Sequence, residues 1–475
     1  MSIKEKKSRL WTFDFTVITV GSLISMAGNA IAGIALGFIT AKTTNNNIAL
    51  FALLQVGFAL PAAITPMLAG PILDRIPRKH IIYSLDFLST LLYIGLYFLV
   101  KHNALPYGLQ ICGTMIFGCI QGIYTVAYDS LYPNLVAPGN MRRAYAIGSM
   151  LWPLAGGITY LLSAAGIEGI GVAKLFLVVA GAFFTAAVFE TMVRKQEEHI
   201  KPTKAVKRPP LNVLWRDIAD KTREIMRTHD KSGIAAFFAA AGEILARERR
   251  ERIAAYEGSD IKRLSQFIDD LKEGFAYLRG EKGLAGIVVY FFCNAIVWGA
   301  AGVMLYPYFL SAFGESTGLW MFTMLMTAST IGRFLGGFAQ YFIKYPASKK
   351  FAIALFVYSA LCFIEGGYLF VPVFGIMLVL HFISGALAVT SYNIRISATQ
   401  QYVPDLVRAR FNSVFVILNT LGTALGAGVA ATMGTAWKIP VPIAVAILNF
   451  INVLMIIFVL LPRRKDVAAI YNVDL

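Results

Sequence analysis

Residues 48–79 read IALFALLQVGFALPAAITPMLAGPILDRIPRK, an apolar run followed directly by a short basic loop. Residues 48–70 contain no charged side chain, and a helix needs roughly 20 apolar residues to cross the hydrocarbon core of a bilayer. Short loops rich in lysine and arginine remain in the cytoplasm. The stretch therefore predicts a membrane-spanning helix that returns the chain to the cytoplasm.

Runs of the same kind recur along the whole chain. Together with residues 48–70 they number twelve, with six on either side of a polar stretch. The other runs lie near residues 13–40, 80–100, 107–130, 144–165, 171–192, 284–310, 317–342, 351–371, 373–397, 411–435 and 440–461. We therefore predict an all-α membrane protein with twelve transmembrane helices.

The composition indicates a chain whose main solvent is lipid. Of its 475 residues, 57% are hydrophobic and 15% are charged, whereas a typical soluble domain has roughly 25% charged residues. The mean hydropathy is +0.64. The four cysteines lie in apolar runs without the spacing of metal ligands, so we predict no metal site and no disulfide framework.

The basic residues are concentrated in alternate loops. A net charge of +16 in a soluble protein would suggest a nucleic-acid partner, but here the position of the charges indicates topology instead. They occur at the N-terminus and at Arg75/Arg78/Lys79, Arg142/Arg143, Lys344/Lys349/Lys350, Arg408/Arg410 and Arg463/Arg464/Lys465. This pattern predicts an inner-membrane protein with both termini in the cytoplasm, where anionic lipids and not nucleic acid meet these charges.

A polar stretch at 193–283 interrupts the apolar pattern. It contains 20 lysine and arginine residues against 15 acidic residues and includes helix-like segments near 211–228 and 233–256. We interpret it as a cytoplasmic linker with amphipathic helices; a regulatory or partner-binding domain is the alternative. The predicted domains are an N-terminal six-helix bundle (1–192), this linker (193–283), a C-terminal six-helix bundle (284–462) and a cytoplasmic tail (463–475).

The two halves contain a weak internal repeat. The fourth span ends in Leu-Val-Ala-Pro at 135–138 and is followed by Arg142 and Arg143, whereas the tenth ends in Tyr-Val-Pro-Asp at 402–405 and is followed by Arg408 and Arg410. A repeat within a 6+6 membrane chain is typical of transporters built from two related bundles around a site near the membrane midplane.

The loop at 70–79 resembles a known signature. Its sequence Gly-Pro-Ile-Leu-Asp-Arg-Ile-Pro-Arg-Lys is similar to the G-x-x-x-D-R-x-G-R-[RK] motif of the major facilitator superfamily, with Pro77 at a usual glycine position. In that family the loop charges combine with an acid at the cytoplasmic end of the fourth span. The resemblance implies the major facilitator fold and a conformational gate formed by Gly70, Asp74, Arg75, Arg78 and Asp129.

A second resemblance lies in the fifth span. Exporters of this superfamily carry G-x-x-x-G-P-x-x-G-G there, and the sequence at 148–157 matches except that Trp152 replaces the second glycine. Proline bends the helix and glycine permits close packing. The resemblance implies an antiporter-like motif, and thus export, at Gly148, Pro153, Gly156 and Gly157.

Weaker similarities at 128–133 and 269–279 resemble the drug and macrolide-efflux and siderophore-export branch. The overall resemblance covers nearly the whole chain outside residues 200–262. One feature of proton-coupled antiporters is missing: Gly118 occupies the usual arginine position of an R-x-x-x-G motif in the fourth span. The proton-coupling residue is therefore expected elsewhere.

Glu365 and His381 are the candidates for proton coupling. Glu365 lies 15 residues after Lys350, which is about 22 Å along a helix, and His381 lies at a comparable depth in the next span. Ionisable groups within a membrane helix are expensive and indicate function. A carboxyl and an imidazole that face each other there could share one proton; a structural hydrogen-bonded pair is the alternative.

Four other acids lie nearer the predicted cytoplasmic edge. Asp14, Asp86, Asp129 and Glu190 occur within a few helical turns of basic loops. We expect snorkelling, or arginine partners from the loops, to satisfy their charges.

Uncharged polar and aromatic side chains on several spans are predicted to line a central cavity. A buried amide needs a hydrogen-bond partner, and a water-filled cavity supplies one. Arg333, about 15 Å from the cytoplasmic side, is predicted to bind an anionic group of the substrate or to pair with Glu365. The substrate-binding candidates are Asn29, Gln55, Gln121, Tyr124, Asn294, Trp298, Arg333, Tyr392 and Asn419.

We therefore predict a secondary transporter that exports a hydrophobic or amphipathic small molecule in exchange for protons by alternating access. An uptake permease or lipid transporter of the same fold is one alternative, and a membrane sensor or scaffold that acts through residues 193–283 is another. No nucleophile, metal or nucleotide motif occurs, so neither an enzyme nor a cofactor is predicted. The expected partners are a small-molecule substrate, protons and anionic lipids, with the protein as a monomer.

Overall fold

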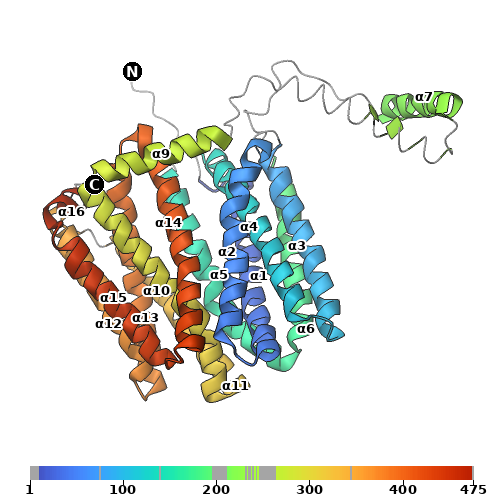
Figure 1. Cartoon of the computed structure of the whole chain (residues 1–475). Helices are drawn as coiled ribbons and strands as arrows, with labels where there is room; N and C mark the ends of the chain where they lie inside the picture. The colour runs from blue at the N-terminus through green and yellow to red at the C-terminus, as the bar shows by residue number, and fades with distance from the viewer. Residues whose placement is uncertain are drawn as a thin grey trace.

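The computed structural model is built of α-helices (Figure 1). It describes residues 10–73, 76–137, 141–194, 211–229, 264–342 and 345–472, together with isolated residues between 233 and 244. No strand occurs among these residues. The predicted all-α class is therefore confirmed.

Twelve long helices form two groups of six. The N-terminal group contains α1 (Phe13–Thr44), α2 (Ile48–Leu73), α3 (Arg78–Lys101), α4 (Tyr107–Leu135), α5 (Met141–Gly169) and α6 (Val172–Thr191). The C-terminal group contains α10 (Lys282–Phe313), α11 (Glu315–Phe342), α12 (Lys350–Gly367), α13 (Phe374–Tyr402), α14 (Asp405–Ala431) and α15 (Val441–Met455). Short 3-10 and π segments lie at η2 (Ala347–Lys349), η3 (Tyr368–Phe370), η4 (Thr432–Ala436) and η5 (Ile456–Leu460). Each predicted span falls on one of these helices.

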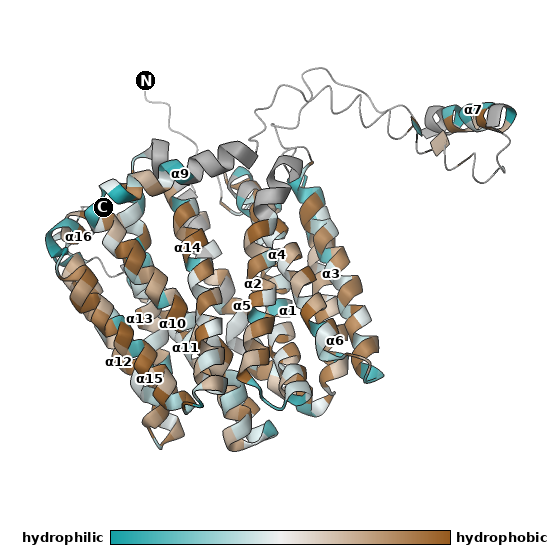
Figure 2. Ribbon diagram, viewed as in Figure 1, coloured by the Kyte–Doolittle hydropathy of each residue, from teal (hydrophilic) through white to brown (hydrophobic). Residues whose placement is uncertain are grey.

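The helices are suited to a lipid environment. Among the described residues, ten helices are long and apolar enough to cross a membrane, and α5 and α11 add helices of 29 and 28 residues to the same bundles. Hydrophobic residues predominate along the helices, whereas hydrophilic residues gather near their ends (Figure 2). Phe356 and Phe363 are 69% and 70% exposed, which lipid tolerates and water does not. The chain is a multi-pass membrane protein.

Helix packing repeats from one half to the other. In the N-terminal bundle α1 packs against α5 and α6, α2 against α4, and α3 against α6. In the C-terminal bundle α10 packs against α14 and α15, α11 against α13, and α12 against α15. Because these pairs correspond in chain order, the two bundles are structural repeats of each other.

The two bundles meet mainly at one end of the molecule. We call the end where α1 begins and α16 (Arg464–Tyr471) lies the terminal end, and the opposite end the distal end (Figure 1). Near the distal end, two apolar clusters of described residues combine side chains from both bundles, such as Phe183 with Phe309, and Ala52 with Met304. Near the terminal end, two further clusters each belong to one bundle.

Helices outside the bundles lie in the insertion and the tail. The helix predicted at 211–228 corresponds to α7 (Leu211–His229), whereas most of the one predicted at 233–256 lies outside the described residues. A further helix, α9 (Leu264–Gly280), runs across the terminal end and contacts α14 and α2 (Figure 1). In the tail, the hydroxyl of Tyr471 lies 2.9 Å from that of Tyr358 and joins α16 to α12.

Candidate functional site

Close packing of α11 on α13 builds the site. A Cβ added at Gly332 or Gly385 would overlap a carbonyl oxygen of the facing helix, that of Phe382 or Ser329 respectively. A Cβ added at Gly336 would lie 2.8 Å from the Cα of Ala386. Glycine lets membrane helices approach this closely, and the approach brings the side chains that flank Gly332 and Gly385 next to each other.

A carboxyl group and an imidazole lie beside this crossing. Glu365 Oε1 on α12 accepts a hydrogen bond from the Ser384 hydroxyl on α13 and lies 3.9 Å from His381 Nδ1. The Glu365 side chain is 23% exposed, whereas that of His381 is 3% exposed. The ring of Tyr368 covers the imidazole at a centroid distance of 4.5 Å. Glu365 thus has limited access to its surroundings, and His381 is enclosed.

Arg333 connects this pair to the other bundle. Its guanidinium lies 5.0 Å from the centre of the Trp298 ring on α10, which is favourable cation–π geometry. It interacts electrostatically with Glu365 and with Tyr160, which belongs to α5 of the N-terminal bundle. We call Arg333, Glu365, His381 and Ser384 the seam cluster, because it lies where α11 faces α5.

The helix-5 motif faces the same seam. A Cβ added at Gly157 would lie 3.9 Å from the Thr330 methyl of α11, one turn before Arg333. A Cβ added at Gly156 would lie 3.1 Å from Tyr160. Gly148 lies near the Tyr132 hydroxyl instead, and Pro153 is inside the helix. Part of the motif therefore packs at the interface between the bundles; its antiporter role stays a prediction.

A second arginine is enclosed by aromatic rings in the C-terminal bundle. Arg395 is 8% exposed, and its guanidinium lies 4.3 Å from the ring centre of Phe415, 4.9 Å from that of Phe291 and 5.3 Å from that of Tyr392. Tyr392 itself is 48% exposed. A binding candidate thus borders a buried cation that has no carboxylate partner among the described residues.

Four of the other predicted binding residues are engaged in hydrogen bonds. Asn294 accepts from Asn452 at 3.1 Å, and Tyr124 donates to Glu190 at 3.0 Å. The Asn419 amide donates to the Phe415 carbonyl at 2.9 Å, and Gln121 donates to Thr125 at 3.1 Å. These four therefore hold helices or their own turns, and the structure does not gather them at one point.

The remaining binding candidates differ in exposure. Trp298 is 48% exposed, Gln55 is exposed and Asn29 is half-buried. Trp298 is the one that contacts the seam cluster directly.

Most of the predicted conformational gate lies outside what the structure describes. Asp74 and Arg75 fall in a gap, and the surroundings of Gly70 on α2 are likewise outside the described part. Arg78 begins α3 and Asp129 is exposed on α4. The gate therefore stays a prediction.

The expectation for Asp86 and Glu190 was wrong. Neither snorkels to an edge nor pairs with a loop arginine within the described chain; each is 1% exposed, and the two carboxyl groups lie close enough to interact electrostatically. Span counting placed each acid by its depth but did not show which helices face one another. The glycines of the α11–α13 crossing were also missed, although Gly332 and Gly336 have the G-x-x-x-G spacing that indicates such a crossing.

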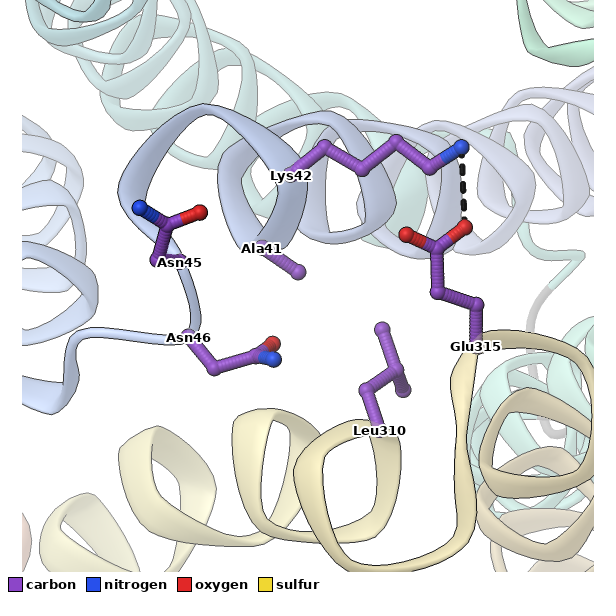
Figure 3. Close-up of a pocket in the computed structure, with 6 residues that line it drawn as sticks. All are labelled: Ala41, Lys42, Asn45, Asn46, Leu310 and Glu315. Atoms are coloured by element: carbon purple, nitrogen blue, oxygen red, sulfur yellow. Dashed lines mark ion pairs between the residues drawn. The ribbon is translucent and has the colours of Figure 1, made fainter.

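Polar contacts close the seam at the distal end. Lys42 at the end of α1 forms a 2.9 Å ion pair with Glu315 at the start of α11, beside a pocket of about 300 Å³ that Asn45, Asn46 and Leu310 help to line (Figure 3). Glu168 of α5 accepts hydrogen bonds from Ser316 and Trp320 of α11. These contacts hold the two bundles together.

No group of three or more potential metal ligands occurs within the described ranges. The geometry instead defines a membrane protein of two repeated six-helix bundles with a polar cluster at their seam. A family model for the Major Facilitator Superfamily matches residues 18–364. The chain belongs to this superfamily: it is a secondary transporter and not an enzyme.

Solved structures share the fold. A structure of the nucleoside transporter NupG has 13% sequence identity and a TM-score of 0.57, with 93% of this chain and 97% of that chain covered. A peptide transporter POT in complex with sulfate has 14% identity and a TM-score of 0.60, with 97% and 96% covered. A bacterial homologue of the human lysosomal transporter Spinster, inward-facing and unoccupied, has 14% identity and a TM-score of 0.57, with 97% and 96% covered. No curated protein sequence matches this chain.

Proposed function

We propose that the protein exports a hydrophobic or amphipathic small molecule in exchange for protons. The seam cluster is the observation that carries this proposal. It combines a carboxyl group, an imidazole and a guanidinium at the interface where the bundles must move relative to each other.

The chemistry of the cluster suits proton exchange. Glu365 can hold a proton within the membrane or give it up to form an ion pair, because the Arg333 guanidinium lies near enough to stabilise its carboxylate. A substrate that donates a hydrogen bond to the Glu365 carboxylate would stabilise its ionised form and favour proton release. Proton binding and substrate binding would then compete, as antiport requires.

The packing of the bundles supports alternating access. The contacts of Lys42 with Glu315 and of Glu168 with Trp320 close the distal end, whereas the apolar clusters of the terminal end do not cross between the bundles. If the terminal end faces the cytoplasm, as the basic loops indicate, this state is open to the inside of the cell. The location would be the inner membrane, with both termini in the cytoplasm.

The substrate would contact Trp298 and Arg333 of the C-terminal bundle, on the side that faces Tyr160 of the N-terminal bundle. Trp298 offers an exposed aromatic surface beside the Arg333 cation, a combination suited to an amphipathic molecule that carries an anionic group. Export is supported by the resemblance of the helix-5 motif to that of exporters, and Gly157 of this motif packs against α11 at the seam. We further propose that the protein acts as a monomer surrounded by anionic lipids.

A flux assay tests the coupling. A thermal-shift screen of antibiotics, siderophores, lysolipids and peptides first selects a ligand, and its transport is then followed in proteoliposomes at several pH gradients. The wild type should respond to the gradient, Glu365→Gln should not, and Glu224→Gln, which changes an exposed carboxylate on α7, should behave like the wild type. An unchanged pH response in Glu365→Gln would exclude this residue as the coupling site.

Vesicles of fixed orientation test the direction. An export protein moves the ligand from its cytoplasmic face against an inward proton gradient, whereas an uptake permease moves it the opposite way. A lipid transporter would instead redistribute labelled lipid between leaflets. A sensor or scaffold would show no flux of any ligand and would lose its function when residues 205–262 are deleted.

A further inference from the structure

The N-terminal bundle contains a second buried carboxyl pair. Asp86 of α3 and Glu190 of α6 are each 1% exposed, and their carboxyl groups lie close enough to interact electrostatically. The Tyr124 hydroxyl of α4 donates to Glu190 Oε1 at 3.0 Å. Three helices thus meet at two acids inside the bundle.

No described cation compensates the pair. Within the described chain, neither acid forms an ion pair with a lysine, arginine or histidine. Two cations lie at the nearby helix ends, but Lys79 donates to the Val193 carbonyl at 3.2 Å and the guanidinium of Arg194 lies over the Phe13 ring. Two ionised carboxylates in such a site would repel each other strongly.

A carboxyl–carboxyl hydrogen bond needs a proton, since an ionised carboxylate can only accept. Asp86 Oδ2 and Glu190 Oε2 are both buried without a hydrogen-bond partner. One shared proton would let one carboxyl group donate to the other, which neither group can do when both are ionised. A buried site of this kind points to a bound proton as its ligand.

The surroundings are polar on one side and apolar on the others. Ser22 of α1 lies beside the Tyr124 and Tyr128 hydroxyls of α4. The other described titratable groups within electrostatic range of the pair or its tyrosines are Tyr93 of α3 and Asp129 and Tyr132 of α4. Toward the terminal end, an apolar cluster that includes Phe15, Ile18, Ile82 and Val193 closes the bundle. Proton exchange thus requires a movement of the helices.

Tyr124 supplies the connection to such a movement. It stacks on Tyr128 at 5.9 Å, which in turn stacks on Tyr132 at 5.3 Å, so that a row of three rings follows α4. The Tyr132 hydroxyl donates to the Ala144 carbonyl of α5 at 2.8 Å. This row of packed rings therefore links the carboxyl pair to α5, the helix that faces α11 at the seam.

We propose that Asp86 and Glu190 form a second proton-binding site, which holds one shared proton and releases it when α4 moves. On release, one carboxyl O–H bond breaks, the proton passes to water, and two carboxylates remain. The role of this proton in transport rests on the proposed function, whereas the presence of the proton-binding site does not.

Infrared difference spectroscopy on the reconstituted full chain tests the site. The wild type should show a deuterium-sensitive C=O band of a protonated carboxyl at neutral pH, and Glu190→Gln and Asp86→Asn should each lose it. Tyr124→Phe should shift the band, because it removes a hydrogen bond and no carboxyl. Glu365→Gln should leave this band in place.

Three results would overturn the proposal: no protonated carboxyl band in the wild type, the same band in Glu190→Gln as in the wild type, or an unshifted band in Tyr124→Phe. The last variant decides the question if the two acid variants fail to fold. A thermal shift with sodium in the absence of the band would identify a cation site instead. The proposed function is tested by the transport activity of Glu365→Gln, whereas the Asp86–Glu190 site is tested by its infrared band. Either proposal can therefore fail without the other.

Discussion

Within the described residues, each bundle contains an acidic site among its helices, and the two sites differ in what surrounds the carboxyl group. Glu365 in the C-terminal bundle has an imidazole, a hydroxyl and a guanidinium nearby and is partly exposed. Glu190 in the N-terminal bundle has another acid and a tyrosine as neighbours and is enclosed. The first site has charges that can replace a proton, whereas the second does not.

The difference between these surroundings indicates which site can couple proton movement to substrate movement. A carboxyl group that can exchange its proton for an ion pair can switch without leaving the membrane interior. A carboxyl pair without a cation must stay protonated until the structure opens. We therefore propose that the substrate-linked step occurs at the seam cluster and a conformation-linked step at the Asp86–Glu190 pair.

The largest expected effect comes from breaking the α11–α13 crossing that builds the seam cluster. Gly385→Val places a side chain against the Ser329 carbonyl and should lower the stability of the fold by about 1–3 kcal/mol. Thermal unfolding in detergent measures this. Gly375→Val, at a position on α13 with open space around it, is the control, and equal melting of the two variants would contradict the packing described here.

Removal of the guanidinium tests the C-terminal site without changing its fold. Arg333→Gln should weaken binding of an anionic ligand on the order of tenfold, or about 1.4 kcal/mol, because the charge beside Trp298 is lost. Titration of the ligand selected by thermal shift gives the dissociation constant. Arg464→Gln on α16 at the terminal end should bind like the wild type; equal weakening of both variants would point to a general charge effect.

Removing one tyrosine hydroxyl at each site allows a direct comparison of the two sites. Tyr124→Phe removes the donor to Glu190 and should cost about 1 kcal/mol of stability. Tyr368→Phe, beside His381, removes a buried hydroxyl that has no hydrogen-bond partner and should cost less. Melting temperatures of the two variants provide the comparison, and a larger loss for Tyr368→Phe would reverse it.

The smallest effect is expected at the distal ion pair. The side chains of Lys42 and Glu315 are 52% and 60% exposed, and such pairs contribute about 0–1 kcal/mol. Lys42→Met should therefore barely change the melting temperature. It should, however, shift the two bundles toward a state that is open at the distal end, which is measured as faster labelling of a cysteine introduced at Ala41. Labelling at the wild-type rate would show that the pair does not hold the seam.

The sequence predicted the helices and much of the seam cluster. Apolar runs and loop charge located all twelve long helices. Counting residues from Lys350 placed Glu365 at the depth of His381, and in the structure Glu365 Oε1 lies 3.9 Å from His381 Nδ1. Their role in coupling stays a prediction. Ser384 was missed although it lies three residues after His381, on the same helix face.

The N-terminal pair could not be predicted in this way. Hydropathy gives the depth of Asp86 in α3 and of Glu190 in α6, but not the rotation of each helix or its neighbours. That α3 packs on α6 follows from the bundle topology, which emerges only when all six helices are assembled. The same limit explains why Tyr124 was assigned to a cavity, although it donates to Glu190.

Proton movement driven by substrate tests the central claim most directly. Proteoliposomes that contain a pH-sensitive dye are given a gradient of the selected ligand without any initial pH gradient. The account predicts that ligand flux through the wild type drives protons in the opposite direction and that Glu365→Gln abolishes this proton movement. Proton movement at the wild-type rate in Glu365→Gln would contradict the account.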